Sequence, residues 1–213
     1  MVVDPQKTEN SDRMPTHLQH NHVGISPKLR NAVNGHQAGV LWFTGLPSSG
    51  KTTLAQALQR ELFELGYQVF VLDGDDIRIR LNSDLGFEPA DRTEHIRRVG
   101  NVAALFADAG MIVIAACISP YGDDRERARV AAENRFHCVY IQADMDICKQ
   151  RDPYGLWEKS RRGEIQNFTG VDAPYEVPEN PQLIINTVDY SIEECVVQLL
   201  DYVKIEFALL SES

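Results

Sequence analysis

The chain has 213 residues, of which 43% are hydrophobic and 24% charged, and its formal net charge is −10. This length and composition are ordinary for one globular α/β domain with a substantial core. No apolar run reaches the roughly 18 residues of a membrane span, and the N-terminus has no apolar signal core, so we expect a cytoplasmic protein without a membrane partner. The acidic balance argues against nucleic acid as a partner, since nucleic acid needs a basic face.

Residues 1–36 are rich in Asn, Gln, His, Asp and Pro and show no periodicity. We interpret them as a mobile N-terminal arm that carries a short helix over residues 26–33. Residues 37–213 are predicted to form one domain.

From residue 39 onward, apolar runs alternate with helical patterns. The runs predict strands over 39–44, 68–72, 111–116, 137–141 and 183–186. The patterns predict helices over 50–66, 75–81, 91–109, 123–134, 144–150, 154–162 and 191–207. This alternation predicts an α/β fold: a doubly wound, mainly parallel sheet with helices on both faces and ligands at the carboxyl ends of the strands.

A glycine-rich loop joins the first predicted strand to the first long helix and fits G-x-x-x-x-G-K-[ST] at every fixed position. Such a loop turns backbone N–H groups toward one point at the positive end of a helix, which cradles phosphate oxygens. Lys51 reaches the β- and γ-phosphates, and the Thr52 hydroxyl is a Mg²⁺ ligand. The motif predicts a P-loop nucleotide-binding fold with ATP held by Gly45, Leu46, Pro47, Ser48, Ser49, Gly50, Lys51, Thr52 and Thr53.

Two carboxylates follow the second strand, in Asp73-Gly74-Asp75. In a doubly wound sheet they lie beside the phosphate loop, where they can support Mg²⁺ and accept a proton from an attacking hydroxyl. A turn with a helix N-cap is the structural alternative. The third strand runs into Ile118-Ser119-Pro120-Tyr121 without an aspartate, which favours a small-molecule kinase over a motor or GTPase.

Arginines supply the local positive charge. Arg78, Arg92, Arg97, Arg98 and Arg125 follow strand ends or loops on the ligand side, and we expect about half of them to form surface ion pairs. The short helices over 144–162, flanked by Arg151, Arg161 and Arg162, are consistent with a lid over ATP.

Two phenylalanines and four cysteines complete the candidates. Phe87 and Phe168 lie in glycine-bearing loops, where such rings either anchor a loop on the core or stack on a base. Cys117, Cys138, Cys148 and Cys195 form no CxxC pair and are interpreted as buried, reduced thiols.

Residues 39–186 resemble the adenylylsulfate kinase family. The resemblance lies in GLPSSGKTT (45–53), LDGD (72–75), DLGF (84–87), IRRVG (96–100), LFADAG (105–110), ISPY (118–121), RDP-GL (151–156) and NFTG (167–170). It implies transfer of the ATP γ-phosphate to the 3′-hydroxyl of adenylyl sulfate with Mg²⁺ as cofactor, in sulfate assimilation, by a protein that commonly pairs into homodimers.

The resemblance also implies roles for individual residues. Phe87 and Phe168 match the pair that stacks on the adenine of adenylyl sulfate, and Arg78 and Arg92 match the ligands of its phosphosulfate. Ser119 matches a serine assigned as a phosphorylated intermediate, which in-line transfer does not require. The remaining substrate-side matches are His95 and Ile118.

The sequence departs from the family pattern on the acceptor half. The departures are Asp76, Ile79, Arg80, His95, Cys117, Gly122 and Tyr154, where the family usually has Asn, His, Gly, Asn, Phe, Arg and Lys. They leave the ATP half untouched and leave the choice of acceptor open.

We therefore expect an adenylylsulfate kinase in which Asp75 orients or deprotonates the 3′-hydroxyl, Asp73 and Thr52 support the metal, and Lys51 neutralises phosphoryl charge. The order of the two aspartates stays open. The alternatives are a kinase of the same fold for another nucleotide conjugate or sugar acid, and a non-catalytic nucleotide-binding partner of an ATP sulfurylase.

Overall fold

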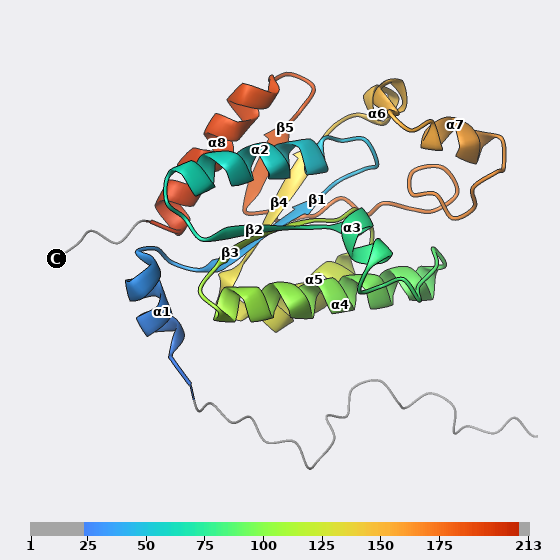
Figure 1. Cartoon of the computed structure of the whole chain (residues 1–213). Helices are drawn as coiled ribbons and strands as arrows, with labels where there is room; N and C mark the ends of the chain where they lie inside the picture. Colours follow the sequence, from blue (N-terminus) through green and yellow to red (C-terminus); the bar gives the residue numbers. More distant parts are fainter. Residues whose placement is uncertain (1–23, 209–213) are drawn as a thin grey trace, which may run out of the picture.

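A parallel five-stranded sheet forms the centre of the molecule in the computed structural model, which describes residues 24–208 (Figure 1). The sheet has the order β2-β3-β1-β4-β5, and every neighbouring pair is parallel. Its strands are β1 (Gly39–Thr44), β2 (Val69–Asp73), β3 (Ile112–Ala116), β4 (Phe136–Gln142) and β5 (Leu183–Asn186). The five predicted strands and the doubly wound fold class are confirmed.

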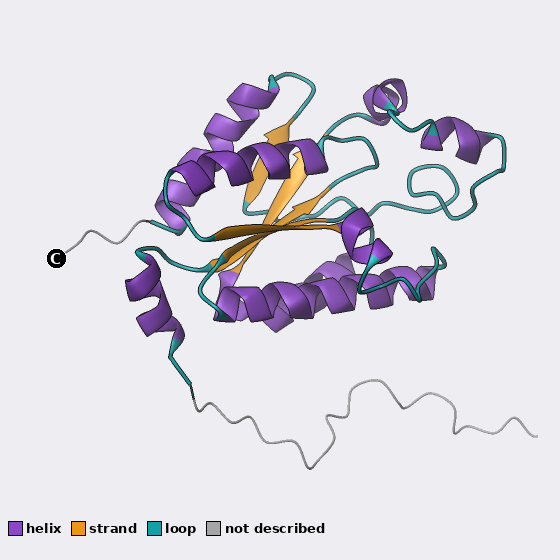
Figure 2. Cartoon of the chain, viewed as in Figure 1, coloured by secondary structure: helices purple, strands orange, loops and turns teal. Residues whose placement is uncertain are grey.

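Helices cover both faces of the sheet, as Figure 2 shows by the two purple layers around the orange strands. The longer helices are α2 (Lys51–Glu64) and α8 (Ile192–Glu206) on one face, and α4 (Pro89–Asp108) and α5 (Gly122–Ala132) on the other. Because β1 and β3 are covered on both sides, all of their residues are buried, which explains their unbroken apolar sequence. The two faces of β1 belong to two separate core clusters, one under α2 and α8 and one under α4 and α5.

The short helices lie around the ends of the sheet. They are α1 (Pro27–Asn34), α3 (Gly74–Ile79), the 3₁₀ turn η1 (Glu133–Arg135), α6 (Met145–Arg151) and α7 (Leu156–Arg161). Helix α1 confirms the helix expected within the N-terminal arm, while residues 1–23 of that arm lie outside the described residues. None of the helices described between residues 24 and 208 is long and apolar enough to span a membrane.

The strand order places the ligand-binding edge. Strand β1 lies between β3 and β4, so the chain leaves it toward β2 and β3 on one side and later toward β4 and β5 on the other. The connections between strands therefore run in opposite directions on the two sides of β1. The loop that follows β1 lies at this switch point, where doubly wound sheets bind ligands.

Candidate active site

The phosphate loop occupies this switch point. Strand β1 ends at Thr44, and α2 begins at Lys51 after Gly50, whose φ of 102° lies in the left-handed region that glycine tolerates. At Gly45 a Cβ atom would lie 2.5 Å from the Ile141 carbonyl oxygen, so only glycine fits between the loop and β4. The loop thus places the N-terminus of α2, with its unpaired N–H groups, at the carboxyl-end edge of the sheet.

The Lys51 side chain is held against the loop that it follows. Its ammonium donates hydrogen bonds to the carbonyl oxygens of Gly45 at 3.0 Å and Leu46 at 2.7 Å, and to Ser49 Oγ at 3.4 Å. Burial lowers the pKa of Lys51 to about 8. The ammonium is therefore kept at the phosphate-binding end of α2 at neutral pH.

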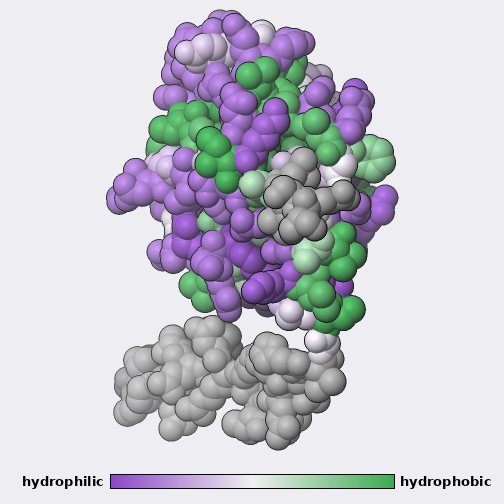
Figure 3. All heavy atoms as spheres, turned by 90° about the vertical axis from the view of Figure 1, so that its left-hand side faces the viewer, coloured by the Kyte–Doolittle hydropathy of each residue, from purple (hydrophilic) through white to green (hydrophobic). Residues whose placement is uncertain are grey.

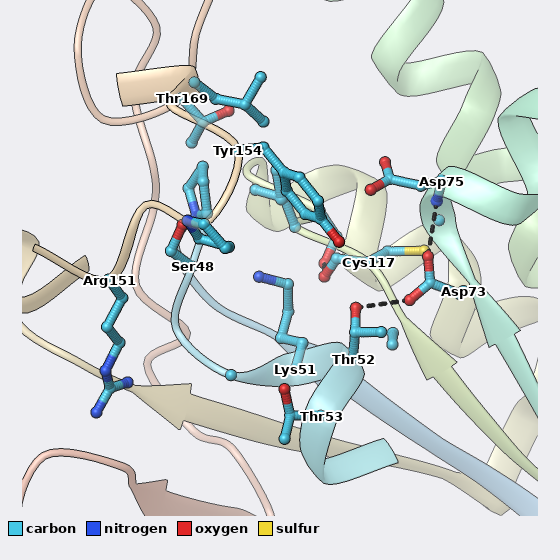
Figure 4. A pocket seen from close by; sticks show the side chains of 18 of the residues that line it. Ser48, Lys51, Thr52, Thr53, Asp73, Asp75, Cys117, Arg151, Tyr154 and Thr169 are labelled. Carbon is cyan, nitrogen blue, oxygen red and sulfur yellow. Dashed lines mark hydrogen bonds between the residues drawn. The ribbon is translucent and has the colours of Figure 1, made fainter. Parts of the chain in front are cut away.

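Asp73 connects β2, α3 and the phosphate loop (Figure 4). Its Oδ2 accepts a hydrogen bond from Thr52 Oγ1 at 2.7 Å, and its Oδ1 accepts one from the Asp75 backbone N–H at 2.9 Å. Asp73 is thus the N-cap of α3, as the structural alternative expects, and it also contacts the helix that follows the phosphate loop through Thr52.

The Asp75 side chain lines the same cleft as Asp73 and Lys51, and it lies beside Asp73 and across from Lys51 (Figure 4). Desolvation by the surrounding walls, with the Asp73 carboxylate as the second cause, raises the pKa of Asp75. A carboxylate with a raised pKa next to a phosphate site is suited to accept a proton.

The end of β3 forms the floor of the site. Ser119 is buried, and its Oγ accepts a hydrogen bond from Trp42 Nε1 at 3.0 Å and donates one to the Cys117 carbonyl oxygen at 3.4 Å. Arg125, expected to meet a ligand or a surface carboxylate, instead donates to the backbone carbonyls of Ser119 and Glu176. This buried arginine therefore fixes the course of the loop after β3.

A second group of side chains faces the phosphate loop; we call it the arginine side, and it comprises Arg78, Phe87, Arg92, His95 and Phe168. The Arg78 guanidinium lies 4.5 Å from the centre of the Phe87 ring, and Arg92 lies 5.6 Å from it. Both arginines also donate to backbone carbonyls, Arg78 to Gly86 and Arg92 to Phe87 and Asn167. Arg78 thereby connects α3 with the loop before α4, and Arg92 connects that loop with the loop of Phe168.

The two phenylalanines differ in their surroundings. Phe87 is 56% exposed, whereas Phe168 is 8% exposed and packs edge-on against Trp157, with ring centroids 5.2 Å apart. Phe168 anchors its loop on a small core cluster, whereas Phe87 is largely exposed and lines the cleft.

His95 stands on the buried face of α4, 5% exposed at the wall of the cleft. Its Nδ1 lies 2.8 Å from Nδ2 of Asn82. Burial, with Arg78 and Arg92 nearby, lowers the pKa of His95 to about 3, so the imidazole is neutral.

One cleft of about 1520 Å³ joins the two sides. Sites for single drug-sized ligands occupy roughly 300–1000 Å³, so this cleft has room for two nucleotides. Of the phosphate-loop residues predicted to bind ATP, Gly45, Leu46 and Ser49 do not line the cleft. The predicted site residues that line it are Pro47, Ser48, Gly50, Lys51, Thr52, Thr53, Asp73, Asp75, Arg78, Phe87, Arg92, His95, Ile118, Ser119 and Phe168.

The lid arginines do not act as a group. Arg151 lines the cleft and donates to Thr187 Oγ1 at 2.9 Å, and Thr187 Oγ1 donates in turn to the Ser49 carbonyl at 2.9 Å. Arg161 and Arg162 form exposed ion pairs with Glu158 and Glu164 instead. Arg97 and Arg98 likewise pair with Glu94, which confirms that some of the arginines form surface ion pairs.

The sequence interpretation missed one part of this cleft and did not place another side chain in it. The loop after β5, with Thr187, Val188 and Asp189, closes it beside the phosphate loop. Its position at the carboxyl end of a strand was the available signal. The departure Tyr154 lies between α6 and α7, 76% exposed, with its ring pointing into the cleft (Figure 4). All four cysteines are free and buried, as expected.

The fold and the phosphate loop define a P-loop kinase, an ATP-using phosphotransferase. The family model described as Adenylylsulphate kinase matches residues 37–186. The chain belongs to this family.

Relatives support the assignment across most of the chain. An adenylyl-sulfate kinase of Bacillus velezensis is 54% identical over 172 residues, which cover 80% of this chain and 87% of that protein. The structure of the Mycobacterium tuberculosis APS kinase CysC in complex with AMPPNP and APS matches with a TM-score of 0.76 at 43% identity, covering 79% of this chain and 98% of that chain. The hexameric APS kinase from Thiobacillus denitrificans matches with a TM-score of 0.63 at 33% identity, covering 84% of this chain and 31% of that chain.

Proposed function

We propose that this protein transfers the γ-phosphate of ATP to the 3′-hydroxyl of adenylyl sulfate, giving 3′-phosphoadenylyl sulfate. One observation carries the proposal: the phosphate loop, the Asp73–Asp75 pair and the arginine side line a single cleft large enough for both nucleotides. Residues 37–213 are proposed as the catalytic domain, which is supported by the family match over residues 37–186.

The cleft offers oxygen ligands for Mg²⁺. Thr52 Oγ1 and the Asp73 carboxylate lie 2.7 Å apart at the phosphate-binding end of α2, and hydroxyl and carboxylate oxygens suit this hard cation. Between residues 24 and 208, no three or more His, Cys, Asp or Glu side chains gather into a metal site, so phosphate oxygens and water complete the coordination we propose. Bound Mg²⁺ supplies charge neutralisation on the phosphates.

The other side chains of the cleft have separate roles in the proposed transfer. Lys51 holds ATP phosphates and offsets the charge that develops on the transferred group. Asp75 orients the 3′-hydroxyl and accepts its proton, which its raised pKa favours. Arg78 and Arg92 bind the phosphosulfate, and Phe87 stacks on the adenine. Phe168, Ile118 and His95 complete the acceptor site.

Direct transfer between the two substrates fits this geometry better than a phosphorylated Ser119. The Ser119 hydroxyl is 1% exposed and is bound to Trp42 and to a backbone carbonyl, so it would have to leave both partners to attack ATP. In-line transfer needs only positioning and charge neutralisation, which the cleft provides. The assignment of Ser119 as an intermediate stays a prediction.

We propose that two copies of the chain pair through α1. Leu29 and Val33 lie four residues apart on one face of α1, and Ile25 lies just before the helix; each of the three is more than half exposed. Apolar side chains gather on this side of the molecule, next to where the grey N-terminal atoms begin (Figure 3). A hexameric relative supports self-association. Leu29→Glu should weaken self-association in light scattering over a concentration series, and Val130→Glu on α5 serves as the exposed control.

A cytoplasmic location is proposed on the four free, buried cysteines, which fit a reducing compartment.

A mass-spectrometric assay tests the function. Purified protein with Mg²⁺ and ATP is given adenylyl sulfate, other nucleotide conjugates, sugar acids or shikimate in parallel reactions. We expect 3′-phosphoadenylyl sulfate as the dominant product. Negligible transfer to adenylyl sulfate with transfer to another acceptor would show a different kinase, and binding of both nucleotides without product would show a non-catalytic module.

A further inference from the structure

The contact between Asn82 and His95 determines which atom of the imidazole carries a hydrogen. Asn82 lies between α3 and α4 and is fully buried. Its backbone N–H donates to the Ile77 carbonyl at 2.9 Å, and its carbonyl accepts from the Leu85 N–H at 3.1 Å. The residue is therefore fixed by its own backbone, and its side-chain Nδ2 reaches His95 Nδ1 at 2.8 Å.

Asn82 Nδ2 is the amide atom in contact with the ring and only donates hydrogen bonds, so we infer that His95 Nδ1 is the unprotonated acceptor, an arrangement that leaves the buried Asn82 Oδ1 without a partner. A neutral imidazole then carries its hydrogen on Nε2. An imidazolium would turn a second donor toward Asn82 and would add a third positive charge beside Arg78 and Arg92, the two charged groups that act on it from α3 and α4. The contact thus favours one tautomer and excludes the charged form near neutral pH.

The remaining ring nitrogen, Nε2, belongs to a side chain that lines the ligand cleft. Within residues 24–208, Nε2 of His95 has no hydrogen-bond partner, and the His95 side chain lines the cleft with Arg92 as its neighbour. The guanidiniums on this side suit an anionic group, whereas a neutral N–H suits a neutral acceptor atom.

We propose that Asn82 is a positioning residue that holds His95 as the Nε2–H tautomer, so that His95 donates one hydrogen bond to a neutral nitrogen or oxygen acceptor on the adenosine of adenylyl sulfate. This inference rests on the proposed function for its ligand. It also gives a physical account of a histidine where the family resemblance leads one to expect asparagine: the neutral imidazole retains a single N–H donor.

The tautomer is measurable without substrate. In ¹⁵N-labelled protein, long-range correlation spectra distinguish protonated from unprotonated ring nitrogens, and His95→Asn identifies the signals of this ring. We expect an unprotonated Nδ1 and a protonated Nε2 throughout pH 6–8. A protonated Nδ1, or a doubly protonated ring at pH 6, would overturn the inference. This failure is distinct from failure of the proposed function, which is absence of turnover by the wild-type protein.

A double-mutant cycle tests whether Asn82 acts through His95. Asn82→Ala and His95→Ala should each raise the KM for adenylyl sulfate by about tenfold, the value of one hydrogen bond, and leave the KM for ATP unchanged. The double variant should be no worse than His95→Ala alone, because coupled residues are not additive. Additive losses, or equal losses in both KM values, would show a merely structural role.

Asn82→Asp provides a second variant that preserves size. Its carboxylate accepts a hydrogen bond from Nδ1–H and raises the pKa of His95, so the KM for adenylyl sulfate should become pH-dependent between pH 5.5 and 8. A flat profile like that of the wild-type protein would contradict the inference. Thermal unfolding of each variant checks that the fold is retained.

Discussion

The two sides of the cleft are built in different ways. The phosphate-loop side is a continuous segment, residues 45–53, shaped by backbone conformation at Gly45 and Gly50 and supported by Asp73. The arginine side is assembled from α3, α4 and two loops distant in sequence, and its two arginines donate hydrogen bonds to the backbone of those loops. A site made by backbone geometry tolerates little change, whereas a site made by side chains can change single partners and keep its shape.

The departures from the family pattern lie outside the phosphate loop itself. The loop matches its motif at every fixed position, whereas His95 and Tyr154 line the cleft from other segments and Cys117 lies beside Asp73 (Figure 4). Both side chains fit their surroundings: His95 contacts Asn82, and Tyr154 is 76% exposed.

The largest effect on turnover is expected at Asp75, between the phosphate-loop side and the arginine side. Asp75→Asn removes the proton acceptor but retains size and the α3 N-cap made by Asp73, so turnover should fall by about 10²–10⁴-fold while ATP affinity stays within about twofold. Steady-state kinetics and nucleotide titration measure the two quantities. The neighbouring Asp76→Asn is the control and should retain most activity; unimpaired turnover of Asp75→Asn would refute the role of Asp75.

A pH series separates the two sides. Because burial lowers the pKa of Lys51 to about 8, the ammonium is lost as pH rises through 8, and ATP affinity should fall by about fivefold between pH 8 and 9. Affinity for adenylyl sulfate should stay flat from pH 6 to 7.5, because His95 remains neutral there.

Isothermal titration at each pH gives both affinities. In Lys51→Arg the charge persists at pH 9, so the fall in ATP affinity should disappear. An equal fall in this variant would show that another group titrates.

Phe87→Ala tests the arginine side alone. Loss of the exposed ring face should raise the KM for adenylyl sulfate by about tenfold, within the range measured for base stacking, and leave the KM for ATP unchanged. Phe63→Ala, which removes a ring on α2 that is 73% exposed and lies outside the cleft, is the control. If both KM values rise together in Phe87→Ala, the ring serves the fold of the cleft and not the acceptor.

The sequence was sufficient for features that depend on local patterns. Continuous apolar runs marked β1 and β3, and the spacing of apolar residues marked α2 and α4, because a buried strand and an amphipathic helix leave distinct periodicities. The phosphate loop was predictable for the same reason, since its glycines and lysine act within one short segment.

Contacts between distant segments could not be predicted in this way. Asn82 and His95, or Arg125 and the carbonyl of Ser119, become partners only when α3, α4, β3 and α5 have packed. The same holds for Phe168, whose burial against Trp157 depends on how α7 meets its loop. Composition and spacing indicate which residues are capable of chemistry, but tertiary packing determines which partner each one finds.

The central claim is that one cleft holds the 3′-hydroxyl of adenylyl sulfate between Asp75 and the γ-phosphate of ATP. A crystal structure of this protein with a non-hydrolysable ATP analogue and adenylyl sulfate measures it most directly. We predict the 3′-oxygen within hydrogen-bond distance of the Asp75 carboxylate and in line with the γ-phosphate. A 3′-oxygen turned away from Asp75, with the adenosine outside the arginine side, would contradict the account.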